Sequence, residues 1–108
     1  MSKPRAYEYA EVITGLIQFE QRPTPLLLLY IRENNEERID LDFKEGRLGA
    51  LNLMGAEGWK LASERPAPEA RIQWAVAQLP AEGAQLLRVK RFEAVEFLMM
   101  RKAPRHER

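Results

Sequence analysis

The sequence predicts an α+β domain in which one main helix, residues 46–57, packs on one face of an antiparallel sheet of about five to six strands. Residues 7–14 alternate with a period of two and are rich in strand-forming residues, until Gly15 ends or bends the strand. Residues 26–43 have the pattern of a hairpin around an Asn pair. Residues 46–57 place apolar side chains at helical spacing, and Gly58 follows them directly.

The composition restricts the class of protein. The chain has 108 residues, of which 45% are apolar, so we expect one domain at residues 1–102 and a flexible tail at 103–108. The 17 Lys and Arg against 16 Asp and Glu give no overall attraction to nucleic acid or anionic membranes, and the lack of cysteine excludes disulfides. The longest apolar run, 26–31, is far shorter than the ~20 residues of a membrane span, and the first residues lack a signal-peptide pattern. We therefore expect a cytoplasmic protein with no membrane partner.

The hairpin at 26–43 has a predicted register. Asn34 and Asn35 suit a two-residue turn, because Asn tolerates the positive φ angles that such turns need. A turn of this length fixes which residues face each other across the two strands. The pairs expected on one face are Leu26 with Phe43, Leu28 with Leu41, Tyr30 with Ile39 and Arg32 with Glu37, and those on the other are Leu27 with Asp42, Leu29 with Asp40 and Ile31 with Arg38.

The helix at 46–57 has a predicted end. Gly58 is expected in the left-handed conformation, which would let the Trp59 N–H donate to the Met54 carbonyl in a Schellman closure. Gly55 costs about 1 kcal/mol relative to Ala inside a helix, and close approach of the helix and sheet backbones would explain its presence. The stripe expected to face the sheet consists of Leu48, Leu51, Asn52 and Gly55.

The second half of the chain is expected to complete the sheet. Residues 59–65 and 86–92 have strand patterns, and 94–102 is apolar on both faces, which is typical of a central strand. Residues 71–79 fit two templates. We favour a strand, because a hairpin with 86–92 would extend the sheet. As a strand this segment would bury Ile72, Trp74 and Val76, and as a helix it would bury Ile72, Ala75, Val76 and Leu79.

Three segments resemble a known family. They are the opening Tyr-Glu-Tyr strand at 7–9, Leu51-Asn52 followed by Gly-Ala-Glu-Gly-Trp-Lys-Leu at 55–61, and the closing strand at 97–102. In these segments the chain resembles, over about half of its length, the small bacterial and phage domain known as the domain of unknown function 4177 family. The resemblance implies a small α+β unit with a helix on an antiparallel sheet, and it transfers no activity. Against the family pattern the chain carries two insertions, the hairpin at 26–43 and an extended segment at 66–92, and Lys60 stands where an acidic residue is common.

Residues suited to catalysis or metal binding are few. The single histidine, His106, lies in the polar tail, and Ser63 has no surrounding nucleophile pattern. Asp40 and Asp42 lie near several glutamates, but no loop supplies the six or more oxygens that calcium prefers. A solvated strand edge that opposes aggregation is the expected role of these carboxylates. We therefore expect no enzymatic activity, no catalytic residue, no cofactor and no metal.

Apolar residues that one helix cannot cover give the main functional expectation. If the helix packs on the face of Leu28 and Tyr30, the opposite face still needs cover, and such patches usually bind a partner. We expect a homo-oligomer, most simply a dimer, or docking to another protein through the sheet. The structural alternative is that residues 66–85 form a second helix over this face. The expected interface residues are Leu27, Leu29, Ile31, Trp74, Leu98 and Met100.

A nucleic-acid partner is the alternative functional expectation. From residue 86 to the end the chain has seven Lys or Arg against three Glu, although such runs are most often solvated surface. A basic strand with an aromatic side chain can follow a phosphate backbone and stack a base. The residues expected to do so are Arg88, Lys90, Arg91, Phe92, Arg101 and Lys102.

Overall fold

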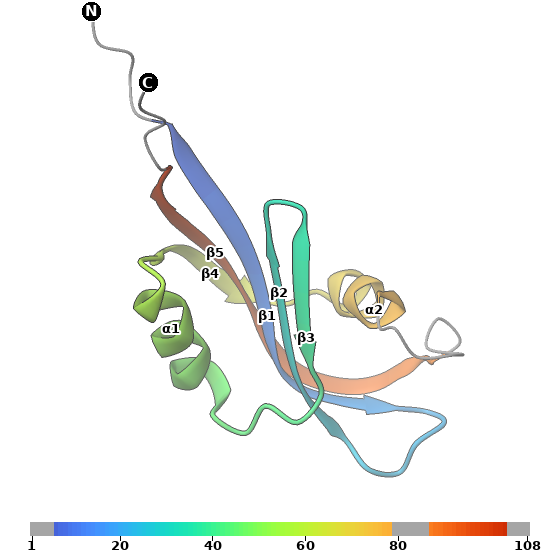
Figure 1. Cartoon of the computed structure of the whole chain (residues 1–108). Helices are drawn as coiled ribbons and strands as arrows, with labels where there is room; N and C mark the ends of the chain where they lie inside the picture. The colour runs from blue at the N-terminus through green and yellow to red at the C-terminus, as the bar shows by residue number, and fades with distance from the viewer. Residues whose placement is uncertain (1–5, 79–86, 104–108) are drawn as a thin grey trace, which may run out of the picture.

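The fold is an α+β arrangement of one antiparallel sheet and two helices, seen in a computed structural model that describes residues 6–78 and 87–103 (Figure 1). Within these residues the sheet has five strands in the order β3-β2-β1-β5-β4, which confirms the predicted fold class. The Ala103 N–H donates to the Ala6 carbonyl at 3.0 Å, so both ends of the described chain lie together. The elements are β1 (Tyr7–Phe19), β2 (Leu26–Glu33), β3 (Glu36–Asp40), α1 (Gly46–Ala56), β4 (Lys60–Pro66), α2 (Glu69–Ala77) and β5 (Val89–Lys102).

The strands β1 and β5 form the long centre of the sheet. They pair along nearly their whole length, and the segment 94–102 lies inside the sheet as predicted. The strand β1 does not end at Gly15, which adopts φ +151° and lies so close to β5 that an added Cβ would be 2.2 Å from the Glu93 carbonyl oxygen. A glycine is needed here because β5 leaves no room for a side chain.

The β2–β3 hairpin has the predicted turn and register. Asn34 takes a positive φ of 55°, and Tyr30 faces Ile39 while Ile31 faces Arg38. The strand β3 ends at Asp40, so the predicted pairs of Leu26 with Phe43 and Leu28 with Leu41 do not form, whereas Leu27 and Asp42 form an isolated bridge. There the Phe43 N–H donates to the Leu27 carbonyl at 2.9 Å, as the chain turns toward α1.

The helix α1 ends as predicted but presents a different face to the sheet. Gly58 has φ +88°, and the Trp59 N–H donates to the Met54 carbonyl at 3.1 Å, which confirms the Schellman closure. Ala50 and Met54 are buried, and of the predicted stripe only Leu51 packs against the sheet, since Leu48 is 67% exposed and Asn52 and Gly55 are exposed too. An added Cβ at Gly55 would meet nothing within 4 Å, and the predicted close approach of backbones is therefore wrong as well.

Residues 71–79 belong to a helix over their described part, and the strand prediction was wrong. The chain leaves β4 at Ala67, and Pro68 in an extended conformation precedes the first turn of α2. The helix template holds over the described residues, since Ile72, Ala75 and Val76 are buried. Leu79 and the predicted junction at 79–86 lie outside the described residues, as do His106 and the rest of the tail beyond residue 103.

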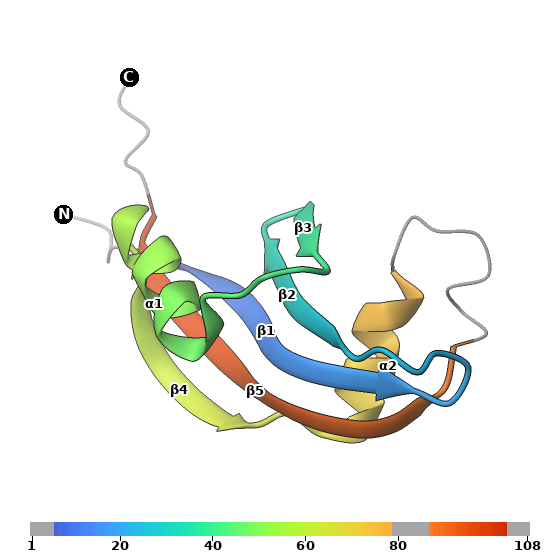
Figure 2. The same ribbon diagram turned by 90° about the horizontal axis from the view of Figure 1, so that it is seen from below.

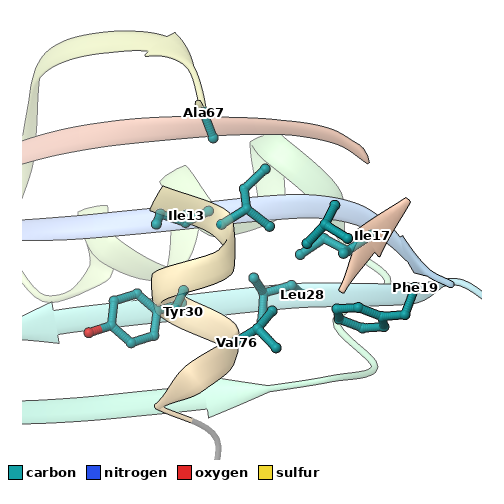
Figure 3. Close-up of a cluster of buried hydrophobic side chains, with 10 residues drawn as sticks. Ile13, Ile17, Phe19, Leu28, Tyr30, Ala67 and Val76 are labelled. Carbon is teal, nitrogen blue, oxygen red and sulfur yellow. The ribbon is translucent and has the colours of Figure 1, made fainter. Parts of the chain in front are cut away.

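The two helices cover opposite faces of the sheet near opposite ends (Figure 2). Beneath α2 lies a buried cluster that includes Ile13, Ile17, Leu28 and Tyr30 (Figure 3). On the opposite face, α1 covers a second cluster. The helix α2 is the second helix of the structural alternative, whereas the expectation that the main helix covers the face of Leu28 was wrong, because α1 covers the face of Leu29 and Ile31. The second cluster contains Ala10, Val12, Leu29, Ile31, Phe43, Ala50, Met54, Trp59, Phe97 and Met99.

Candidate interaction surface

The sheet face that α2 covers is left open at the end nearest the chain termini. Side chains that share a face recur every two residues along a strand, so Tyr7, Tyr9 and Glu11 continue the row of Ile13 beyond the helix. Tyr7 is 48% exposed and Tyr9 is 51% exposed. We define the open patch as Tyr7 and Tyr9 of β1, Leu98, Met100 and Lys102 of β5, and Lys60 of β4, which antiparallel pairing places on one face.

The open patch has an aromatic and apolar centre with lysines at its margin. Tyr9 faces Met100, which in turn faces Lys60, and Tyr7 faces Lys102. A hollow of about 570 Å³ lies among Tyr7, Lys60, Met100 and Lys102, with Gly58 and Arg101 completing its lining. Neither lysine forms an ion pair with any residue in 6–78 or 87–103. Their ammonium groups are therefore available to an external acidic or aromatic group.

The third cation beside this hollow, Arg101, is already engaged on the opposite face. Its guanidinium pairs with the carboxylate of Glu8 and donates to the carbonyl of Glu57 at 2.7 Å. The same group lies 4.1 Å from the centre of the Trp59 ring, a cation–π distance. Arg101 thus holds the end of α1 against the sheet, which leaves Lys60 and Lys102 as the cations that the open patch offers.

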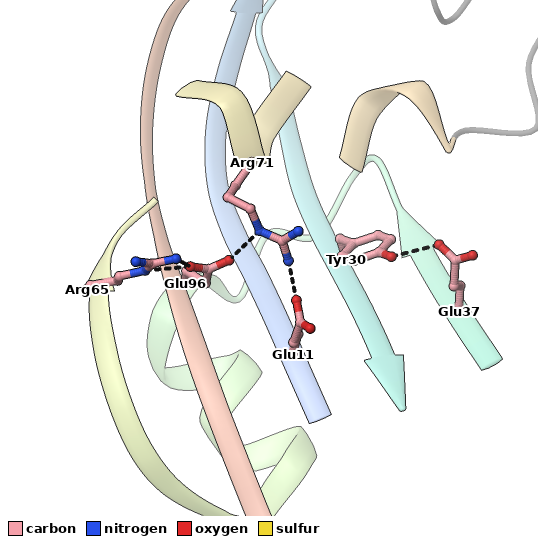
Figure 4. Close-up of polar contacts among 6 residues, drawn as sticks. All are labelled: Glu11, Tyr30, Glu37, Arg65, Arg71 and Glu96. Carbon is pink, nitrogen blue, oxygen red and sulfur yellow. Dashed lines mark hydrogen bonds and ion pairs between the residues drawn. The ribbon is translucent and has the colours of Figure 1, made fainter. Parts of the chain in front are cut away.

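Polar side chains follow the open patch along the same face, where Glu11 lies between Tyr9 and Ile13 on β1, and Figure 4 shows their contacts. Glu96 of β5 accepts hydrogen bonds from Arg65 at 2.6 Å and from Arg71 at 2.9 Å. Arg71 also pairs with Glu11, and so joins α2 to both central strands. We define the polar belt as Glu11, Tyr30, Glu37, Arg65, Arg71 and Glu96, in which the Tyr30 hydroxyl donates to Glu37 at 2.7 Å.

The electrostatics of the polar belt favour the ionised form of Glu96 and the protonated form of Arg71. Burial favours the neutral form of Glu96, but hydrogen bonds from Arg71 and Arg65 outweigh it and lower the pKa of this carboxyl group. Burial likewise opposes the charge of Arg71, yet Glu96 and Glu11 raise its pKa. Burial and the bond to Glu37 raise the pKa of Tyr30. None of these shifts brings a group toward neutral pH, so the chemistry of the belt is that of fixed ion pairs that anchor α2.

A second hollow, of about 430 Å³, borders the polar belt. Its lining includes Ser63 and Leu98 together with Glu11, Arg65, Arg71 and Glu96 of the belt, and Phe97. The two carboxylates and two guanidinium groups in this lining neutralise each other. The hollow therefore continues the open patch as a neutral margin and adds no free charge to it.

The predicted interface residues are divided among several places. Leu29 and Ile31 are 6% and 1% exposed beneath α1, so the expectation that they lie on an uncovered face was wrong. Trp74 packs edge-on against Tyr30 with ring centres 5.5 Å apart, as part of the contact between α2 and the sheet. Leu27 is half-buried on the α1 face, near the opposite end of the sheet. Only Leu98 and Met100 belong to the open patch.

The two tyrosines of the open patch escaped the sequence prediction. Their alternation with Ile13 placed them on one face. The signal that would have found them is the helical template of 71–79, because a short helix at this position leaves their end of the face uncovered.

The predicted nucleic-acid residues do not form one surface. Arg88, Lys90 and Arg91 lie at the start of β5 and Arg101 and Lys102 at its end, about 40 Å apart at the usual rise per residue. Phe92 packs against the cluster beneath α2 and is partly buried, which removes the aromatic group expected to stack a base.

The remaining expectations concern metals, membranes and relatives. Among the described residues no group of three acidic or histidine side chains is placed to hold a metal ion, and Asp40 instead accepts from the Asp42 N–H at 2.8 Å. None of the helices in the described part of the chain is long and apolar enough to cross a bilayer.

Comparisons with protein-family models, with curated proteins and with solved structures found no match. The resemblance to the domain of unknown function 4177 family stays a prediction.

Proposed function

We propose that this protein is a non-enzymatic interaction module that docks to another protein through the open patch. The observation that carries the proposal is the exposure of Tyr7, Tyr9 and Leu98 side by side on a sheet face whose other end is covered by α2. Tyrosine and methionine are enriched at protein interfaces, and tyrosines are frequent among the residues that dominate binding energy. The open patch combines these residues with unpaired lysines at its margin.

The face of the sheet suits docking better than either edge. The strand β4 is exposed along its whole length, but a bulge between Leu61 and Ser63 and several charged residues interrupt it. The opposite edge strand, β3, spans only Glu36–Asp40 and is mostly acidic. Bulges, charges and short length are the features that oppose pairing at a sheet edge. A partner that binds the sheet is therefore expected to contact side chains rather than extend the backbone ladder.

Single-stranded nucleic acid is the second candidate, and a specific observation favours it. Tyr7 and Tyr9 expose rings on the same face as the unpaired Lys60 and Lys102. Exposed aromatic rings beside free cations can stack bases and neutralise phosphates without reading sequence. This candidate differs from the predicted basic strand, because it uses only one end of β5 and takes its aromatic groups from β1.

An in-cell crosslinking experiment tests both candidates. A benzophenone amino acid replaces Tyr9 in the full chain, which is then expressed and irradiated in cells of its source organism. Leu48, which is 67% exposed on α1 and outside the open patch, is the matched control position. We expect a discrete protein adduct from position 9 that position 48 does not give. An adduct that nuclease digestion shortens would favour the nucleic-acid candidate, and equal adducts at both positions would refute docking through the patch.

A further inference from the structure

We infer that the partner of the open patch is a second copy of this chain, packed face to face with its strands running in the opposite direction. This inference rests on the proposed function, since it names the occupant of the same surface. The most common homo-oligomer is a twofold dimer, in which one patch contacts its own copy and must be complementary to itself. The open patch and the polar belt beside it have that property in their charge and in their shape.

The charges follow a gradient along the strands. At the far end of the patch Lys102 faces Tyr7 and has no ionic partner among the described residues. The middle of the patch holds Tyr9 and Met100. At the near end Glu11 faces Leu98, and the side chain of Glu11 is 43% exposed although it pairs with Arg71. A twofold axis that crosses the strands at Tyr9 would bring the Lys102 of each copy toward the Glu11 carboxylate of the other. The dimer would then contain this ionic contact twice.

The position of α2 selects the direction of the second copy. Packed sheets lie about 10 Å apart, and a helix with its side chains is itself about 10 Å wide. Two copies with parallel strands would place both α2 helices between the sheets at the same end, and would hold the patches apart. With antiparallel strands the two helices lie beyond opposite ends of the contact, and only the open patches overlap. Lys60 faces Met100 in the row of Tyr9, so the axis brings it opposite the Lys60 of the other copy. Because β4 is the edge strand, both ammonium groups lie at the margin of the contact and can turn into water.

The central contact of such a dimer is between apolar and aromatic side chains. Tyr9 lies on the axis and meets the Tyr9 of the other copy, Met100 beside it meets Met100, and Leu98 lies in the next row, that of Glu11. Thioether and aromatic groups pack favourably against each other, and a buried Tyr keeps its hydroxyl at the wet rim. The axis thus predicts that position 9 is close to itself in the dimer, which a chemical crosslink can measure.

The chain has no cysteine, so one introduced thiol reports on one position. We expect a short bis-maleimide, which spans the gap between two sheets that lie about 10 Å apart, to join Tyr9→Cys of one copy to the same position of the other at protein concentrations above the dissociation constant. Leu48→Cys, an equally accessible thiol outside the patch, should crosslink at least about tenfold more slowly. Equal rates at the two positions would mean random collision and would overturn the inference.

Light scattering on the unlabelled chain supplies the second measurement. The wild-type mass should approach twice the 12.5 kDa of one chain as the concentration rises. Tyr9→Ser and Lys102→Glu should each raise the dissociation constant at least about tenfold, while Leu48→Ser leaves it unchanged. A dimer that neither patch variant weakens would place the interface elsewhere and refute the inference.

The failure of this inference is distinct from the failure of the proposed function. A wild-type chain that stays monomeric at high concentration refutes the second copy as partner. If position 9 nevertheless crosslinks to a different protein in cells, docking through the patch stands with another occupant. If position 9 crosslinks to no protein and the chain is monomeric, both the inference and the proposed function fail.

Discussion

Arg71 of α2 donates to Glu96 of β5 at 2.9 Å, and this hydrogen bond ties the second helix to the centre of the sheet. The guanidinium of Arg71 also stacks 4.6 Å from the centre of the Trp74 ring and pairs with Glu11. The contacts of Arg71 with Glu96 and Glu11 therefore help to set where α2 lies along the sheet. The position of α2 in turn decides which residues it buries and leaves Tyr7 and Tyr9 open to solvent.

Removal of Arg71 is expected to destabilise the protein substantially. In Arg71→Ala the carboxylate of Glu96, a residue only 8% exposed, keeps Arg65 but loses its partner on α2. Loss of one member of a partly buried ion pair should lower the free energy of unfolding by about 2 to 3 kcal/mol. Arg65→Ala is the matched control. Its side chain is 64% exposed, so urea unfolding should show a loss below about 1 kcal/mol. Equal losses in the two variants would contradict an anchoring role for Arg71.

The stability of the protein is expected to fall in acid through Glu96. Its pKa in the folded chain lies below that of an ordinary Glu side chain, so between these two pKa values the folded state binds fewer protons than the unfolded state. The stabilisation is complete above the ordinary pKa and is lost as the pH falls through the lower pKa of the folded state. Urea unfolding between pH 3 and pH 7, a range chosen about the usual Glu pKa, should show a flatter acid limb for Glu96→Gln. Glu64→Gln should change the limb less, because Glu64 pairs with Arg47 in solvent. If the stability of Glu96→Gln fell with pH as steeply as that of the wild type, Glu96 would not be the source of the acid sensitivity.

The parts of the fold that local chemistry decides were predictable from the sequence. The turn at Asn34 and Asn35 fixes a register within a few residues of itself, and Gly58 ends α1 through bonds to its own last turn. The helix α2 was not predictable in the same way, because residues 71–79 fit both periods. Contacts with strands that are distant in the sequence, such as the hydrogen bond from Arg71 to Glu96, favour the helix over the strand in this segment.

The candidate site was only partly predictable for a related reason. Alternation placed Tyr7 and Tyr9 on the face of Ile13, but exposure depends on where a helix stops, and a helix at 71–79 was only the alternative to the favoured strand. Leu29 and Ile31 were expected to be uncovered because the single predicted helix was assigned to the other face. In the structure α1 follows the chain from Phe43 onto the face of Leu29 and Ile31.

Alanine is expected to change the free energy of unfolding in opposite directions at Gly55, inside α1, and at Gly58, just after it. Gly58 holds φ +88°, so Gly58→Ala forces a side chain into the left-handed region and should lower the free energy of unfolding by about 1 kcal/mol. Gly55 lies inside the helix, and its added Cβ would meet nothing within 4 Å. Gly55→Ala should therefore raise the free energy of unfolding by about 0.5 to 1 kcal/mol. Thermal and urea unfolding measure both, and destabilisation by Gly55→Ala would reveal a hidden need for glycine there.

Lysine substitutions at two apolar positions should separate the core from the open patch. Ile31 is 1% exposed beneath α1, and Ile31→Lys would place an ammonium among apolar side chains with no partner, so we expect loss of the cooperative fold. Leu98 is 37% exposed on the open patch. Leu98→Lys should change the free energy of unfolding of the monomer by less than about 1 kcal/mol, since its ammonium reaches water. Circular dichroism with urea unfolding measures both effects. A folded Ile31→Lys monomer would mean that α1 does not cover this face, and the open patch would then not be the main uncovered apolar surface.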